Sequence, residues 1–129
     1  MSERSWYSGN AADDGAERRG WILGHFMDPS AGERSTDTLE VKWGIHKAGE
    51  QRTEWVTGDK RTTLVLLVQG RFHVKFRDGD VPLIRQGDYL VWGPGTDHSW
   101  KAITDSVVVT VRWPSLPYSE HESTHLRGR

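Results

Sequence analysis

Apolar and polar residues alternate along much of this chain with the two-residue period of β-strands. In residues 38–46, the apolar side chains Leu39, Val41, Trp43 and Ile45 alternate with Glu40, Lys42, Gly44 and His46. Residues 71–77 repeat the pattern, with Phe72, Val74 and Phe76 opposite Arg71, His73, Lys75 and Arg77. Because one face of a strand usually packs on the core, we expect both polar stripes, including Glu40, Lys42 and His46, to be exposed. The alternative is that both faces of residues 38–46 are buried, in which case these three residues would be paired and functional, because an unpaired buried charge is costly.

Segments of this kind recur between Gly, Pro and Asp residues, which favour turns. They are residues 21–27, 38–46, 52–57, 62–69, 71–77, 81–85, 89–92, 98–103 and 106–113. The run Asp78-Gly79-Asp80 predicts a hairpin turn between two of them. Many short strands without a convincing amphipathic helix predict an all-β single domain, built as a sandwich or barrel.

The two ends of the chain lack this alternation. Residues 1–20 are polar, charged and glycine-rich, which predicts a flexible N-terminal arm. Residues 21–115 are expected to form the β-domain, and residues 116–129 a C-terminal tail. The first twenty residues contain no apolar core of a signal peptide, and the longest aliphatic run, residues 64–68, is far too short to span a membrane.

Composition narrows the function classes. A chain of 129 residues fits one domain. It has no cysteine, which excludes disulfides, a thiolate zinc site and a cysteine nucleophile, and suits a reducing cytoplasm. The formal net charge of −1 gives no general attraction to nucleic acid or to a membrane, so neither is an expected partner. The seven tryptophans suit a core or the wall of a ligand pocket.

Residues 87–98 carry a motif of known type: Gly87-Asp88, a short apolar strand, a Pro94-Gly95 turn, and His98 eleven residues after the first glycine. This segment resembles the second motif of the cupin superfamily. Residues 64–70 resemble the end of the first cupin motif, and residues 107–114 the last barrel strand. The resemblance implies a cupin-type double-stranded β-helix, or jelly-roll barrel, with His98 at the start of a strand and facing the interior together with Trp100.

In metal-binding cupins the first motif supplies two histidines and a glutamate. Counting back from Gly70, the resemblance places these ligands at Thr57, Asp59 and Thr63; counting forward from Gly49 gives Trp55 and Thr57. Both counts predict that residues 55 and 57 face the interior, and neither finds a histidine. No cofactor is therefore expected, although iron, zinc or manganese held by an unusual set with His98 and Asp59 remains an open alternative.

One further group of potential ligands is set aside. His46, Glu50 and Glu54 are spaced by four residues, which brings side chains together on a helix and not across a turn at Gly49.

The predicted site is an aromatic-walled pocket inside the barrel. His98 is its candidate catalytic residue, because a histidine can transfer protons at neutral pH. The expected ligand-binding residues are Trp55, Thr57, Asp59, Thr63, Tyr89, Trp92 and Trp100. Aromatic walls with few polar groups favour a flat or apolar small organic molecule.

The favoured function is a cupin that binds a small organic molecule, with metal-independent isomerase, cyclase or lyase chemistry at His98. Two alternatives stay open: a non-catalytic ligand binder or sensor, and a metal-dependent oxygenase with an unusual ligand set. A homodimer is also expected, because Leu64, Leu66 and Val68 alternate with the buried side of the most apolar strand and are too apolar for solvent.

Overall fold

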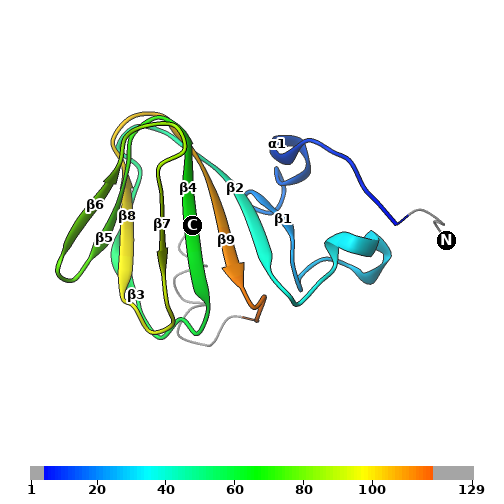
Figure 1. The fold of residues 1–129 in the computed structure, drawn as a ribbon. Helices are drawn as coiled ribbons and strands as arrows, with labels where there is room; N and C mark the ends of the chain where they lie inside the picture. Colours follow the sequence, from blue (N-terminus) through cyan, green and yellow to red (C-terminus); the bar gives the residue numbers. More distant parts are fainter. Residues whose placement is uncertain (1–4, 118–129) are drawn as a thin grey trace.

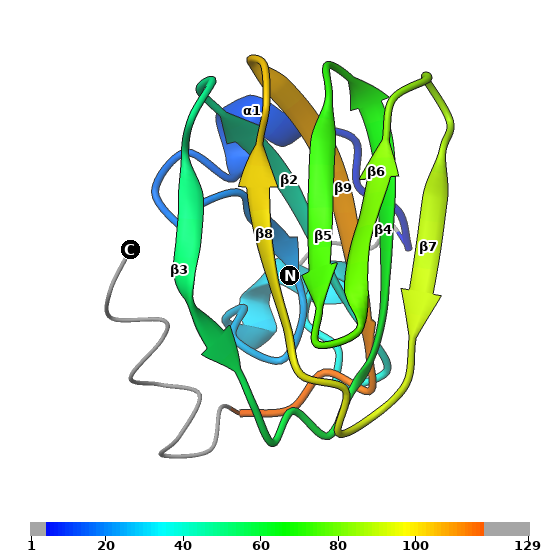
Figure 2. The same cartoon turned by 90° about the vertical axis from the view of Figure 1, so that its left-hand side faces the viewer.

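The predicted strands form two antiparallel sheets that face each other in the computed structural model, which describes residues 5–117. The five-stranded sheet has the order β1 (Trp21–Leu23), β2 (Glu40–His46), β9 (Ser106–Trp113), β4 (Thr62–Gln69) and β7 (Tyr89–Trp92). The four-stranded sheet has the order β3 (Gln51–Val56), β8 (His98–Ala102), β5 (Phe72–Phe76) and β6 (Gly79–Leu83). Figures 1 and 2 show the two layers. The all-β, jelly-roll prediction is confirmed.

Turn residues fix where the strands begin and end. Gly79 opens β6 directly after the turn from β5, and the register pairs it with Phe76. Gly87 and Gly95 have φ values of 93° and 78°, in the left-handed region that only glycine adopts without strain. These two glycines start and end the segment that carries β7, so the motif read from the sequence corresponds to real backbone geometry.

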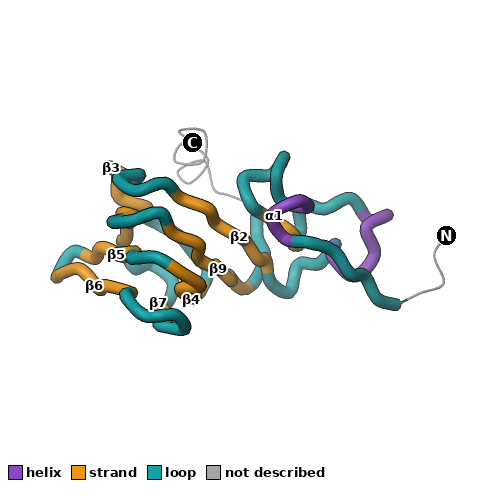
Figure 3. The backbone as a smooth tube through the Cα atoms, turned by 90° about the horizontal axis from the view of Figure 1, so that it is seen from above, coloured by secondary structure: helices purple, strands orange, loops and turns teal. Residues whose placement is uncertain are grey.

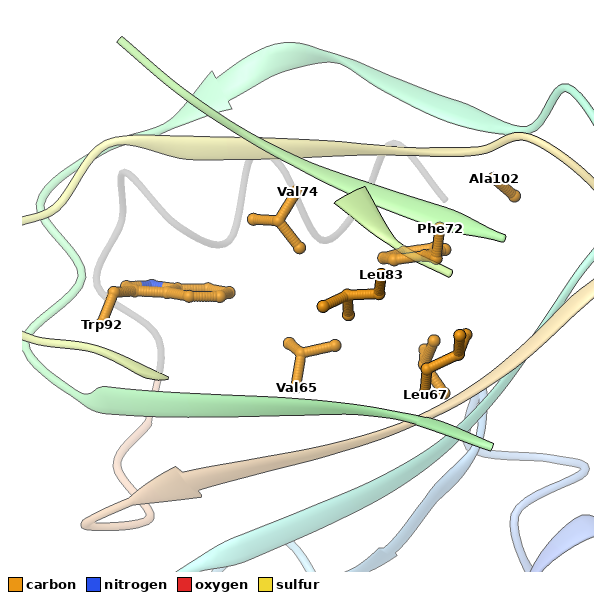
Figure 4. Close-up of a cluster of buried hydrophobic side chains, with 8 residues drawn as sticks. Val65, Leu67, Phe72, Val74, Leu83, Trp92 and Ala102 are labelled. Atoms are coloured by element: carbon orange, nitrogen blue, oxygen red, sulfur yellow. The ribbon is translucent and has the colours of Figure 1, made fainter. Parts of the chain in front are cut away.

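The apolar core lies between the sheets. Its buried members are Val65, Leu67, Phe72, Val74, Leu83, Trp92, Ala102 and Val108. Figure 4 shows Val65 and Leu67 of one sheet facing Val74, Phe72 and Leu83 of the other. On β5 the alternation has the expected sense, because Phe72 and Val74 are buried and the basic stripe is on the outer side.

On β2 the prediction that the polar stripe is exposed is wrong. Glu40 is 1% exposed, while Ile45 is 60% exposed. Lys42 and His46 share the face of Glu40 and line an internal cavity. The polar stripe therefore faces the interior and the apolar stripe faces outward. The physical reason is that Glu40 meets buried arginines from other segments, and such pairing cannot be read from β2 alone.

The N-terminal segment is more regular than the predicted flexible arm. A short helix, α1 (Ala11–Asp14), is capped by the Asn10 side chain, which accepts a hydrogen bond from the Asp13 amide. The Gly20 carbonyl accepts a hydrogen bond from Trp43 of β2, which attaches this segment to the sheet. A 3₁₀ segment, η1 (Pro29–Arg34), follows β1. Figure 3 shows α1 on the side of the five-stranded sheet where β2 lies.

Parts of the predicted arm and tail, residues 1–4 and 118–129, lie outside the described residues. Within residues 5–117, no helix is both long enough and apolar enough to cross a membrane.

The outer face of the five-stranded sheet is apolar across four adjacent strands. The register aligns Val109 of β9 with Trp43 on one side and with Leu66 on the other, and Leu66 in turn with Tyr89. The other outward side chains of this face are Val41, Ile45, Leu64, Val68, Val91, Val107 and Val111. A face of this extent without charged residues suits burial against an uncharged surface of the same kind.

We expect a second copy of the chain to cover this outer face, so that the protein is a dimer in solution. Val109→Lys places a charge at the centre of the face and should shift the protein to monomer, because an unpaired buried charge is costly. Multi-angle light scattering at micromolar concentration measures the mass directly. Ile84→Lys, at a residue 54% exposed and away from this face, is the control. A monomeric wild type contradicts the expectation.

Candidate functional site

A network of buried charges closes one end of the space between the sheets. Glu40 of β2 accepts hydrogen bonds from Arg112 Nε at 2.8 Å and from Arg61 Nη1 at 3.1 Å. Ser115 Oγ donates to the other carboxylate oxygen of Glu40 at 2.7 Å. Arg61 is 2% exposed and Arg112 8% exposed. Buried charges of this kind are stable only when they are paired and hydrogen-bonded, as they are here.

Asp59 neutralises the other side of Arg61. Its Oδ1 accepts from Arg61 Nε at 2.8 Å and from the Arg61 amide at 2.9 Å, and its Oδ2 accepts from Arg61 Nη2 at 3.1 Å. Burial by itself raises the pKa of Asp59, but the hydrogen bonds and charge of Arg61 outweigh it and hold that pKa below its usual value. Two carboxylates thus balance two guanidinium groups.

An inner cavity of about 80 Å³ lies against this network, between the two sheets. Its ionisable lining is entirely basic: Lys42, His46, Arg52, Arg61, His98 and Arg112. A larger outer cleft of about 780 Å³ runs between the N-terminal segment, β2 and β3. Lys42, Arg52 and Trp100 line both spaces, so the outer cleft adjoins the inner cavity.

His98 lies at the wall of the inner cavity and is 8% exposed. Its Nδ1 is 3.0 Å from the carbonyl oxygen of Thr96. Because a carbonyl oxygen only accepts, the neutral ring carries its proton on Nδ1, which leaves the lone pair on Nε2. The ring also packs against Trp92, with 4.6 Å between ring centroids.

The charge state of His98 follows from its surroundings. Burial lowers its pKa below the usual value, and the charges of Arg112 and Arg52 act in the same direction. The hydrogen bond to Thr96 and the charge of Asp59 oppose this without reversing it. His98 is therefore a neutral base at physiological pH, with Nε2 as its basic atom.

Two buried donors beside His98 have no hydrogen-bond partner within the described residues. They are the hydroxyl of Thr63 and the indole N–H of Trp92, and both residues line the inner cavity. The register places Thr63 of β4 between Arg112 of β9 and Trp92 of β7. Buried polar groups are nearly always hydrogen-bonded, so two unpartnered donors on neighbouring strands are an uncommon feature of this cavity wall.

The structure brings together four of the eight predicted site residues: Thr63, Trp92, His98 and Trp100 all line the inner cavity. The prediction that His98 and Trp100 both face the interior is confirmed. Asp59 is buried but turned to Arg61, and it does not line the cavity. Thr57 follows β3, is half-buried, and is likewise absent from the lining.

The interior placement of Trp55 and Tyr89 is wrong. The register pairs Arg52 with Trp100 and Val56 with His98, so these even-numbered residues of β3 face inward and alternation turns Trp55 outward. Trp55 instead packs under the guanidinium of Arg77, 4.2 Å from the ring centroid. Tyr89 alternates with the inward side of β7 and is 62% exposed.

Sequence reasoning missed the basic residues of the site. Arg52, Arg61 and Arg112 gave no motif, although the inward parity of Lys42 with Glu40 is visible in the alternation of β2. His46 and Glu50 were set aside, yet the turn does bring their side chains within 3.2 Å. The turn that connects β2 to β3 carries a hydrogen bond from the Glu50 amide to the Lys47 carbonyl, and this chain reversal brings residues four apart together as a helix does.

The residues present do not fit a metal centre of the kind that the cupin resemblance implies. Within residues 5–117, no three His, Cys, Asp or Glu side chains converge in a way that holds an ion. At the inherited positions, Thr63 offers a hydroxyl and Asp59 is engaged by Arg61.

Comparisons with known proteins identify the fold. No family model and no curated protein matches the sequence. Among solved structures, KdgF from Halomonas sp. is 25% identical with a TM-score of 0.56, over 61% of this chain and 72% of that one. A cupin superfamily protein from Desulfitobacterium hafniense is 18% identical with a TM-score of 0.53, over 59% and 67%. The cupin domain of Cnp3 from Schizosaccharomyces pombe is 13% identical with a TM-score of 0.51, over 58% and 51%.

The charge network should dominate stability. Glu40→Gln leaves Arg61 and Arg112 with one carboxylate between them, which should lower the free energy of unfolding by about 3–5 kcal/mol. Urea denaturation measures the change. The matched control is Glu50→Gln, whose carboxylate is half-exposed in its pair with His46 and should contribute less than about 1 kcal/mol. Equal effects of the two substitutions would contradict the dominant role of the network.

Acidification should destabilise the fold through His98. The unfolded histidine has its ordinary pKa of about 6.5, and the folded pKa is lower, so below that pH the unfolded state binds more protons. Stability is therefore complete above about pH 6.5 and falls as the pH drops towards the folded pKa. His98→Gln should flatten this dependence in denaturation curves between pH 7 and about 5, whereas His73→Gln, on the outer side of β5, should keep it. An unchanged slope in His98→Gln would refute the assignment.

Proposed function

We propose that this chain, which has the fold of the cupin superfamily, binds a small organic molecule between its two sheets and moves a proton on it with His98. The observation that carries the proposal is the arrangement at His98. Nδ1 is held by the Thr96 carbonyl, which leaves the lone pair on Nε2. The ring lines the cavity, and burial keeps it neutral. A general base requires these same properties.

The surroundings of His98 support binding as well as proton transfer. The outer cleft has a volume within the range of small-molecule sites, and Trp100 extends from it to the inner cavity as an aromatic wall. Trp100 also stacks on Phe72, with 5.4 Å between centroids, which fixes the plane of its ring. A ligand in the outer cleft thus meets a rigid aromatic surface before it reaches His98.

The chemistry open to this arrangement is metal-independent. A base at Nε2 removes a proton from a carbon or oxygen of the ligand, and the resulting imidazolium returns it at another position or gives it to a leaving group. This describes an isomerase, cyclase or lyase. The charge developing on the ligand lies near the unpaired donors of Thr63 and Trp92, which suits stabilisation of an oxyanion.

The proposal predicts exchange of a ligand proton with solvent. Ligands are first found by saturable quenching of tryptophan fluorescence with a library of small metabolites, and bound ones are incubated in D₂O. Proton NMR should show loss of one C–H signal with wild-type protein. His98→Gln should slow this exchange by about a hundredfold or more and change affinity only modestly, because it removes the base and keeps the pocket.

His73→Gln on the outer side of β5 serves as the control and should exchange at the wild-type rate. Binding without exchange in the wild type would replace the catalytic proposal by a non-catalytic binder or sensor. Exchange that requires added iron, zinc or manganese would instead favour the metal-dependent alternative.

A further inference from the structure

We infer that the group recognised in the inner cavity is the carboxylate of a small organic acid, held by the hydroxyl of Thr63 and the indole N–H of Trp92 beside the basic wall. This inference rests on the proposed function and names its ligand class. It replaces the flat or apolar ligand that the aromatic residues predicted.

The charge of the wall favours an anion. All six ionisable residues that line the inner cavity are basic, and Glu40 and Asp59 lie behind Arg61 and Arg112 outside the lining. These two carboxylates balance the two arginines, and Lys42 and Arg52 lie where the inner cavity adjoins the outer cleft, which Glu50 and Glu54 also line. In a partly buried cavity such charges act through little solvent, which strengthens their attraction for an anion.

The unpaired donors independently favour a ligand with acceptor atoms. The Trp92 indole nitrogen only donates, and the Thr63 hydroxyl has no partner within the described residues. Thr63 is 2% exposed and Trp92 8% exposed, so both would lose hydrogen-bonding capacity unless a ligand atom accepts. The two residues are directly paired across β4 and β7. A carboxylate presents two acceptor oxygens and can take both bonds.

Size decides how much of the ligand enters. The inner cavity, at about 80 Å³, has room for a group of only a few atoms, since one water occupies about 30 Å³ of liquid volume. The outer cleft is far larger and shares Trp100 with it. The carboxylate therefore occupies the inner cavity, and the rest of the acid lies in the outer cleft against Trp100. This places carbons near the carboxylate within reach of His98.

The indole N–H of Trp92 reports directly on this contact. In ¹⁵N-labelled full-length protein its resonance is assigned with Trp92→Phe, and the protein is then titrated with benzoate and with benzamide. The two probes have the same ring and nearly the same shape but differ in charge. We expect a saturable downfield shift of the Trp92 proton with benzoate, and at least about tenfold weaker binding of benzamide.

Substitutions separate binding from folding. Thr63→Val removes an unpaired buried hydroxyl, so the melting temperature should stay unchanged or rise, while benzoate affinity falls by about tenfold. Arg52→Gln should weaken benzoate and leave benzamide unaffected. Lys75→Met, on the outer side of β5, is the control for charge and should bind benzoate as the wild type does.

The outcomes distinguish this inference from the proposed function. If benzamide binds as tightly as benzoate, or if Thr63→Val lowers stability and leaves benzoate binding intact, the carboxylate inference is wrong, and a neutral ligand for His98 remains. If benzoate causes no shift at Trp92, the inference is likewise overturned. If no member of the metabolite library is bound at all, the proposed function itself fails.

Discussion

The interior of this barrel depends on four buried charges. Glu40 on β2 and Asp59 before β4 hold Arg61 and Arg112, and the hydrogen bonds among them connect the neighbouring strands β2 and β9 to the loop after β3. Removing any one member would leave the buried charges unbalanced, which is among the costliest changes a fold can suffer. This constraint determines which faces of β2 and β9 point inward, because Glu40 and Arg112 must both face the interior.

The facing of β2 and β9 in turn determines which side chains line the cavity and which lie on the outer face of the sheet. With Glu40 inward, alternation also turns Lys42 and His46 to the interior and Val41, Trp43 and Ile45 to the outside. The cavity therefore acquires a basic wall, and the sheet acquires an apolar outer face. His98 stays neutral in this basic interior since burial and the nearby arginines both disfavour its protonated form.

Sequence alternation and turn residues were sufficient to predict the strands, and the Gly87–His98 spacing was sufficient to predict an inward His98. These patterns failed where a contact between distant segments determines which face of a strand is buried. The outward placement of the polar β2 stripe was wrong because its partner, Arg112, is 72 residues from Glu40 along the chain. The inward placement of Trp55 was wrong because it was counted from Gly49 and Gly70, whereas Arg52 and Val56 are the residues of β3 that face inward.

The two faces of the five-stranded sheet are formed by alternate residues of the same strands. Trp43 and Val109 of the outer face alternate along the chain with Lys42 and Thr110 of the cavity wall. A partner that packs on the outer face restrains the backbone that positions the wall, and a ligand in the cavity restrains the same backbone from inside. Each event lowers the conformational entropy still to be lost in the other. Ligand binding and association through this face should therefore favour one another, and the coupling must be equal in both directions.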